Sequence, residues 1–90
     1  MTTWRVALAL ERRELDGQTI AYCDFTGDTF QLAPLTRAIL DSLNAGPADT
    51  PTLSASAARV LGESPAAVET AVADTVSDLE SLGIIERVSL

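Results

Sequence analysis

The sequence lacks the side chains on which most catalytic and metal sites depend. It contains no histidine, which removes the commonest zinc ligand and the usual general base. Its single cysteine, Cys23, excludes an internal disulfide and a cysteine-rich metal site. With no His or Lys present to activate that thiol, we expect Cys23 to be a small apolar strand residue. The sequence therefore predicts no catalytic residue, no cofactor and no metal ligand.

Long apolar runs and basic charge are scarce as well. The N-terminal stretch MTTWRVALALERRELDG is interrupted by Arg5 and soon becomes charged, so it is typical of neither a secretory signal nor a membrane span. We therefore expect a cytoplasmic protein. Thirteen acidic residues against six arginines give a net charge of −7, which repels phosphate backbones and favours a basic or mixed partner.

What is present predicts one small α+β domain spanning residues 1–90. Apolar and polar residues alternate over 4–10, the turn pair Asp16-Gly17 follows, and residues 19–25 are rich in strand formers. A second turn at Gly27 leads to a short strand over 29–32. The order predicts a three-stranded antiparallel meander.

Three helices should follow the meander. Pro34, Pro51 and Pro65 each stand where a helix begins, and the helices are expected over 34–45, from 50 to Gly62, and from 64 to Gly83. Residues 84–90 alternate again and predict a short C-terminal strand. This order of elements is winged-helix-like.

The winged-helix order makes DNA regulation one alternative function. Against it, the third helix contains Glu69, Asp74, Asp78 and Glu80 but no Lys or Arg, so it would place negative charge against phosphate.

A second alternative comes from Asp41-Ser42-Leu43, which is similar to the signature of acyl and peptidyl carrier proteins, in which the serine bears phosphopantetheine. Here Ser42 falls in the last predicted turn of a helix instead of at its start. Three further acids near turns, Asp16, Asp24 and Asp28, are explained by the hydrogen bonds that Asp makes to turn backbone.

The predicted strand over 29–32 has no later strand to cover its outer edge. Its backbone groups are therefore expected to pair with another chain, either an extended peptide or a second copy of this protein. Val72, Val76 and Leu79 of the third helix should be core, whereas the small residues Val68, Ala71 and Thr75 would leave a shallow apolar groove beside the edge.

The chain resembles the PqqD-like proteins over nearly its whole length, and particularly the subgroup from systems that also contain a kinase related to HPr kinase. The resemblance rests on the order and spacing of Trp4, Asp16-Gly17, Tyr22, Gly27-Asp28-Thr29, Leu32-Ala33-Pro34-Leu35 and residues 79–84. The family often has Asn in place of Ala33 and His in place of Phe30.

The resemblance implies a non-catalytic peptide chaperone, or recognition element, for ribosomally made and post-translationally modified peptides. The leader segment of the precursor would pair with the third strand and pack on the third helix, and a modifying enzyme would receive the peptide. Applied to this chain, the peptide-binding residues would be Asp28, Thr29, Phe30, Gln31, Leu32, Val68, Ala71, Val72 and Thr75.

Overall fold

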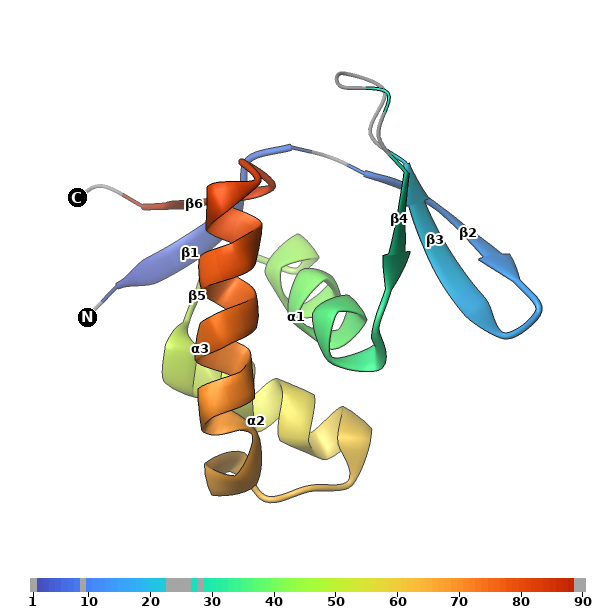
Figure 1. Cartoon of the computed structure of the whole chain (residues 1–90). Helices are drawn as coiled ribbons and strands as arrows, with labels where there is room; N and C mark the ends of the chain where they lie inside the picture. Colours follow the sequence, from blue (N-terminus) through green and yellow to red (C-terminus); the bar gives the residue numbers. More distant parts are fainter. Residues whose placement is uncertain (1, 9, 23–26, 28, 89–90) are drawn as a thin grey trace.

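The computed structural model describes residues 2–8, 10–22, 27 and 29–88. In this part of the chain, two antiparallel three-stranded sheets and three helices form an α+β fold (Figure 1). The α+β class, an N-terminal meander, three helices and a strand near the C-terminus are therefore confirmed. The elements are β1 (Thr3–Val6), β2 (Glu11–Leu15), β3 (Gln18–Tyr22), β4 (Thr29–Leu32), α1 (Pro34–Asn44), β5 (Ala48–Asp49), α2 (Thr50–Leu61), α3 (Pro65–Ser81) and β6 (Ile85–Arg87).

The meander consists of β2, β3 and β4 in that order. Leu15 pairs with Gln18, so the β2–β3 hairpin closes over the two residues Asp16 and Gly17. Both have positive φ, 51° and 77°, as a type I′ turn requires, and the predicted turn is confirmed. The β3–β4 ladder runs as far as Tyr22 opposite Thr29. Cys23, Asp24 and Asp28, with the predicted end of the second strand, lie outside the described residues.

The prediction of one strand over residues 4–10, paired with the strand that begins near Thr19, is wrong. The strand at Trp4 ends at Val6 and pairs with β6 and β5 in the second sheet, whose order is β5-β1-β6. Beyond Val6 the N–H groups of Ala7 and Leu8 both donate to the carbonyl of Ile84, over 2.9 and 3.2 Å, so the chain leaves the ladder there. The first strand of the meander is instead the charged segment Glu11–Leu15.

Local signals place α2 and α3 as expected. The Asp49 carboxylate caps α2 by accepting a hydrogen bond from the Thr52 N–H at 2.9 Å, and bonds from the side chain and backbone of Thr52 lower the pKa of Asp49. Ser64 caps α3 by accepting from the Ala67 N–H at 3.3 Å. Gly62 ends α2 in the left-handed conformation, with φ of 71°.

The hydrophobic core lies among the three helices and the β5-β1-β6 sheet. Trp4 of β1 is buried in it, its indole Nε1 donates to the Thr50 hydroxyl at 3.4 Å, and the Arg87 guanidinium lies 5.4 Å from the centre of its ring. The largest fully enclosed side chains are Ile39, Leu53, Val72 and Ile85. The order α1, β5, α2, α3, β6 around this core gives the winged-helix-like arrangement.

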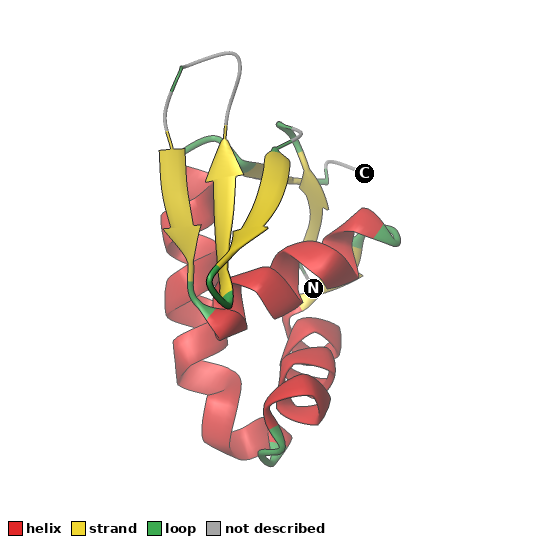
Figure 2. Ribbon diagram, turned by 90° about the vertical axis from the view of Figure 1, so that its right-hand side faces the viewer, coloured by secondary structure: helices red, strands yellow, loops and turns green. Residues whose placement is uncertain are grey.

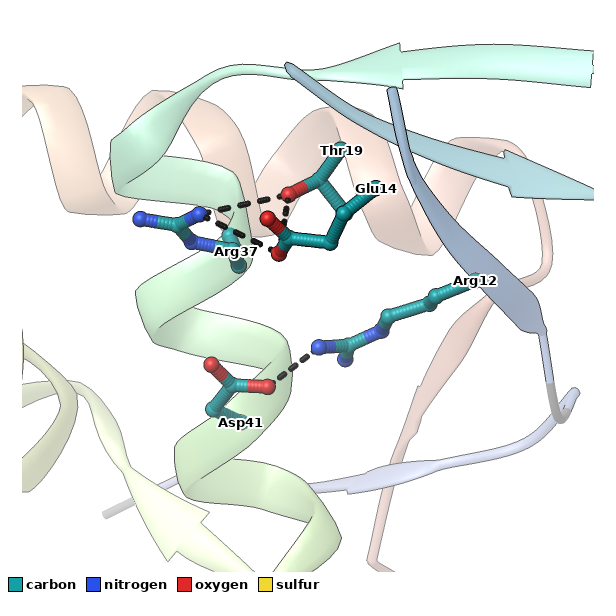
Figure 3. Close-up of polar contacts among 5 residues, drawn as sticks. All are labelled: Arg12, Glu14, Thr19, Arg37 and Asp41. Carbon is teal, nitrogen blue, oxygen red and sulfur yellow. Dashed lines mark hydrogen bonds and ion pairs between the residues drawn. The ribbon is translucent and has the colours of Figure 1, made fainter. Parts of the chain in front are cut away.

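The meander is fastened to α1 by polar contacts (Figure 3). Arg12 of β2 pairs with Asp41 of α1. Arg37 of α1 donates to the Thr19 hydroxyl at 3.2 Å and lies 3.8 Å from the Glu14 carboxylate. Thr19 is buried, and its hydroxyl also lies 3.2 Å from Glu14. One face of the meander is thus held toward α1, and the other is turned away from it.

Candidate functional site

The strand β4 forms one edge of the meander, as the sheet order β2-β3-β4 shows. Its sequence, TFQL, carries no charge. The opposite edge, β2, reads ERREL, and charged residues of this kind protect an exposed edge from pairing with other chains. Of the two edges of the meander, β4 is therefore the one suited to accept an additional strand.

A groove of about 200 Å³ lies beside this edge. The strand β4 is the part of the meander next to α3 in both views of the molecule (Figures 1 and 2). Leu79 is buried at the groove, whereas the side chain of Leu82 remains 57% exposed. The lining residues come from β4, α1 and the C-terminal part of α3 with the turn beyond it: Gln31, Leu32, Thr36, Thr75, Asp78, Leu79, Leu82 and Ile84.

The structure brings together only part of the predicted site. Gln31, Leu32 and Thr75 line the groove. Thr29 is exposed on β4, and the backbone of Phe30 lies in the same strand. Asp28 lies outside the described residues.

The N-terminal half of α3 does not supply the groove that the sequence predicted. Val68 and Val72 are 7% and 0% exposed because they pack into the core, so neither presents a surface to a ligand. Ala71 is exposed but does not line the groove. The apolar surface available beside β4 belongs instead to the last turns of α3.

Sequence reasoning missed five lining residues: Thr36, Asp78, Leu79, Leu82 and Ile84. The one sequence feature that could have indicated this end of the groove is Leu82, an apolar residue that follows the last turn of α3 and precedes Gly83. Leu82 adopts a C-cap conformation, and its N–H donates to the carbonyl of Asp78 at 3.1 Å. This exposed leucine lies at a helix end, beyond the span in which periodicity identifies a buried stripe.

The groove is mainly apolar with one acidic group. Among the described residues that line it, Asp78 is the only charged one, and it forms no ion pair with any described residue. Because Glu69, Asp74 and Glu80 also lie on α3, the field along this helix is negative. The site can bury apolar side chains, pair with a backbone and attract a cationic group, but it brings together no set of groups for acid–base or nucleophilic chemistry.

A larger hollow, of about 320 Å³, lies where the first turns of α2 and α3 meet. Ser54 borders it, but its hydroxyl oxygen is fully enclosed and has no hydrogen-bond partner among the described residues. A ligand in the hollow therefore cannot reach that hydroxyl, and Glu69 at the rim opposes an anion. Ser42, the residue of the carrier alternative, lies in the last turn of α1.

Comparison with models of protein families, with curated proteins and with solved structures gave no significant match to this chain. Among the described residues there is no group of three or more His, Cys, Asp or Glu side chains placed to hold a metal ion. None of the helices in the described part of the chain has both the length and the apolar character needed to cross a membrane. The case for a function therefore rests on the geometry and charge of the groove and edge.

Proposed function

We propose that this protein is a non-catalytic peptide-binding chaperone that captures the leader segment of a ribosomally made precursor peptide and presents it to a modifying enzyme. The observation that carries the proposal is the uncharged edge of β4 lying directly beside an apolar groove. The resemblance to PqqD-like proteins supports it, since the third strand of the meander and the third helix are the elements that the resemblance implies.

Strand addition explains why the edge and the groove belong together. A peptide strand paired with β4 would lie about 4.8 Å from it, and alternate side chains would point to opposite faces of the extended sheet. One set would reach the groove and contact Leu32 and Leu82. Backbone hydrogen bonds would then provide affinity for any extended segment, and the groove would select the side chains.

The chemistry of the groove also limits what the peptide can be. Apolar side chains would be favoured at the positions that face the groove, and a basic residue near Asp78 would be favoured over an acidic one. In this proposal the partners are the precursor and its modifying enzyme, with a kinase-related protein in the same system. The compartment is the cytoplasm, where such precursors are synthesised.

The direct test is a titration of isotopically labelled protein with synthetic peptides that cover the N-terminal segments of short reading frames beside this gene. Amides of β4 and of residues 75–84 should shift, and the β4 amides should become protected from hydrogen exchange. The β2 amides serve as the internal control, because their edge should remain unpaired. A peptide that binds without affecting the β4 amides would contradict strand addition. If no peptide of the panel binds, the proposed function is refuted.

The winged-helix-like order of elements favours one second candidate, a transcription regulator. The acidic α3 opposes it, because the helix that would enter the major groove has no Lys or Arg. A mobility-shift titration on duplex DNA at low salt separates the two functions, and we expect no shift. The carrier alternative predicts a mass increase at Ser42 after incubation with a phosphopantetheinyl transferase, and we expect the intact mass to be unchanged.

A further inference from the structure

The face of the meander that points away from α1 carries an unusual amount of exposed apolar surface. Leu15 is 59% exposed and Tyr22 40% exposed, and the half-buried Ile20 lies between their rows. Together with Glu11 and Arg13 these residues border a shallow hollow of about 310 Å³, here called the outer patch. The helices lie behind the meander when the molecule is viewed from this side (Figure 2). None of these five residues lines the groove beside β4.

The cross-strand register arranges the outer patch in three rows: Glu11 opposite Tyr22, Arg13 opposite Ile20, and Leu15 opposite Gln18. The first two rows each hold one charged residue on β2 and one apolar residue on β3. These two rows are about 7 Å apart, the spacing of alternate residues in a strand.

This arrangement is complementary to itself. A twofold axis that runs across the strands midway between the two rows would bring Glu11 of one copy over Arg13 of the other. The same axis would bring Tyr22 over Ile20, so each dimer would form two charge pairs and two apolar contacts. An axis centred on the Arg13 row would instead oppose two arginines, so the charges favour the first of these two arrangements.

We propose that the outer patch is an isologous dimer interface, and that its partner is a second copy of this chain. The two meanders would pack face to face at the usual spacing of about 10 Å, which the long side chains of Glu11 and Arg13 can bridge. Packing through this face leaves the backbone edge of β4 open. The dimer would thus carry two peptide grooves, which distinguishes it from a dimer formed by pairing of β4 edges.

The interface is small, so we expect weak association. In sedimentation equilibrium, the fraction of dimer should rise with protein concentration up to the millimolar range. Tyr22→Lys should raise the dimer Kd about 100-fold or more, because it removes an aromatic contact and places an unpaired cation against Ile20 twice in each dimer. The matched control is Val60→Lys on α2, where an apolar residue that is more exposed than Tyr22, at 59%, lies outside the outer patch. That variant should dimerise like the wild type, and circular dichroism checks that both variants are folded.

Charge reversal tests the proposed arrangement itself. Glu11→Arg and Arg13→Glu should each raise the dimer Kd about 10-fold, because each turns two attractive pairs into repulsive ones. The double variant restores opposite charges across the axis and should return the Kd to that of the wild type.

A monomeric wild-type protein at millimolar concentration would overturn the proposal. So would a dimer that Tyr22→Lys leaves intact, a double reversal that fails to restore association, or a dimer in which the β4 amides become protected from exchange. None of these outcomes depends on peptide binding, and a folded Tyr22→Lys monomer can still be titrated with leader peptides.

Discussion

Replacing Leu82 by alanine should weaken peptide binding about fivefold. Fully burying a leucine contributes about 1.5–3 kcal/mol, and 57% of the Leu82 side chain remains exposed in the unbound protein. A peptide in the groove can therefore gain roughly 1 kcal/mol by covering it, which corresponds to about a fivefold change in Kd. The stability of the fold should change by no more than about 0.5 kcal/mol, because the residue is exposed.

The assay is isothermal titration calorimetry with the tightest-binding leader peptide from the panel, alongside urea denaturation of each variant. Val60→Ala is the matched control, since Val60 is 59% exposed on α2 and does not line the groove. Its Kd should equal that of the wild type. If Leu82→Ala binds as tightly as the wild type, or if Val60→Ala loses as much affinity, the groove beside β4 is not the peptide site.

Further predictions concern how the scaffold is held together. Arg37→Met should speed hydrogen exchange in β2 and β3, because Thr19 and Glu14 lose their shared cation, while Arg59→Met on the exposed side of α2 should leave that exchange unchanged. The pKa of the Asp49 carboxyl is lowered in the folded protein, so this group stabilises the fold at pH values above its unfolded pKa, near 3.8. Its contribution is lost as the pH falls through the lowered pKa of the folded state. Asp49→Asn should keep the cap but remove this acid dependence in urea titrations between neutral and acidic pH. Leu53→Ala should cost about 3 kcal/mol in the free energy of unfolding, because Leu53 is fully buried; a loss below about 1 kcal/mol would mean that the core is wrongly placed.

The helices could be predicted from sequence because their signals are local. Pro65 directly follows the cap Ser64, and Pro51 stands two residues after the cap Asp49, where Thr50 was the expected cap. Each helix begins within one residue of the predicted position. The meander was predicted in outline, but its first strand was not, because Glu11–Leu15 shows no apolar alternation. Its inward residues Arg12 and Glu14 are compensated by Asp41 and Arg37 on a helix far along the chain, and no period in the sequence reveals that pairing.

The candidate site was predicted on its strand side and misplaced on its helix side. Counting the strands in the sequence predicts that the outer edge of residues 29–32 is unpaired. Gln31 and Leu32 were therefore assigned to the site, and both line the groove. Which end of α3 lies beside that edge depends on how the helix crosses the meander, and a periodic stripe does not contain this information. Val68, predicted to line the groove, is therefore buried in the core, whereas Leu82, beyond the last helical turn, carries the exposed surface.

The position of β1 between β5 and β6 has a consequence for synthesis of the protein on the ribosome. Residues 4–6 pair with residues 85–87, so this sheet cannot close until residue 87 has been made and has left the ribosome. The meander, whose pairings are all local, can form much earlier. The edge of β4 would then exist before α3 and Ile84 complete the groove. A nascent chain would therefore expose an unpaired strand edge before the groove that selects the peptide side chains has formed.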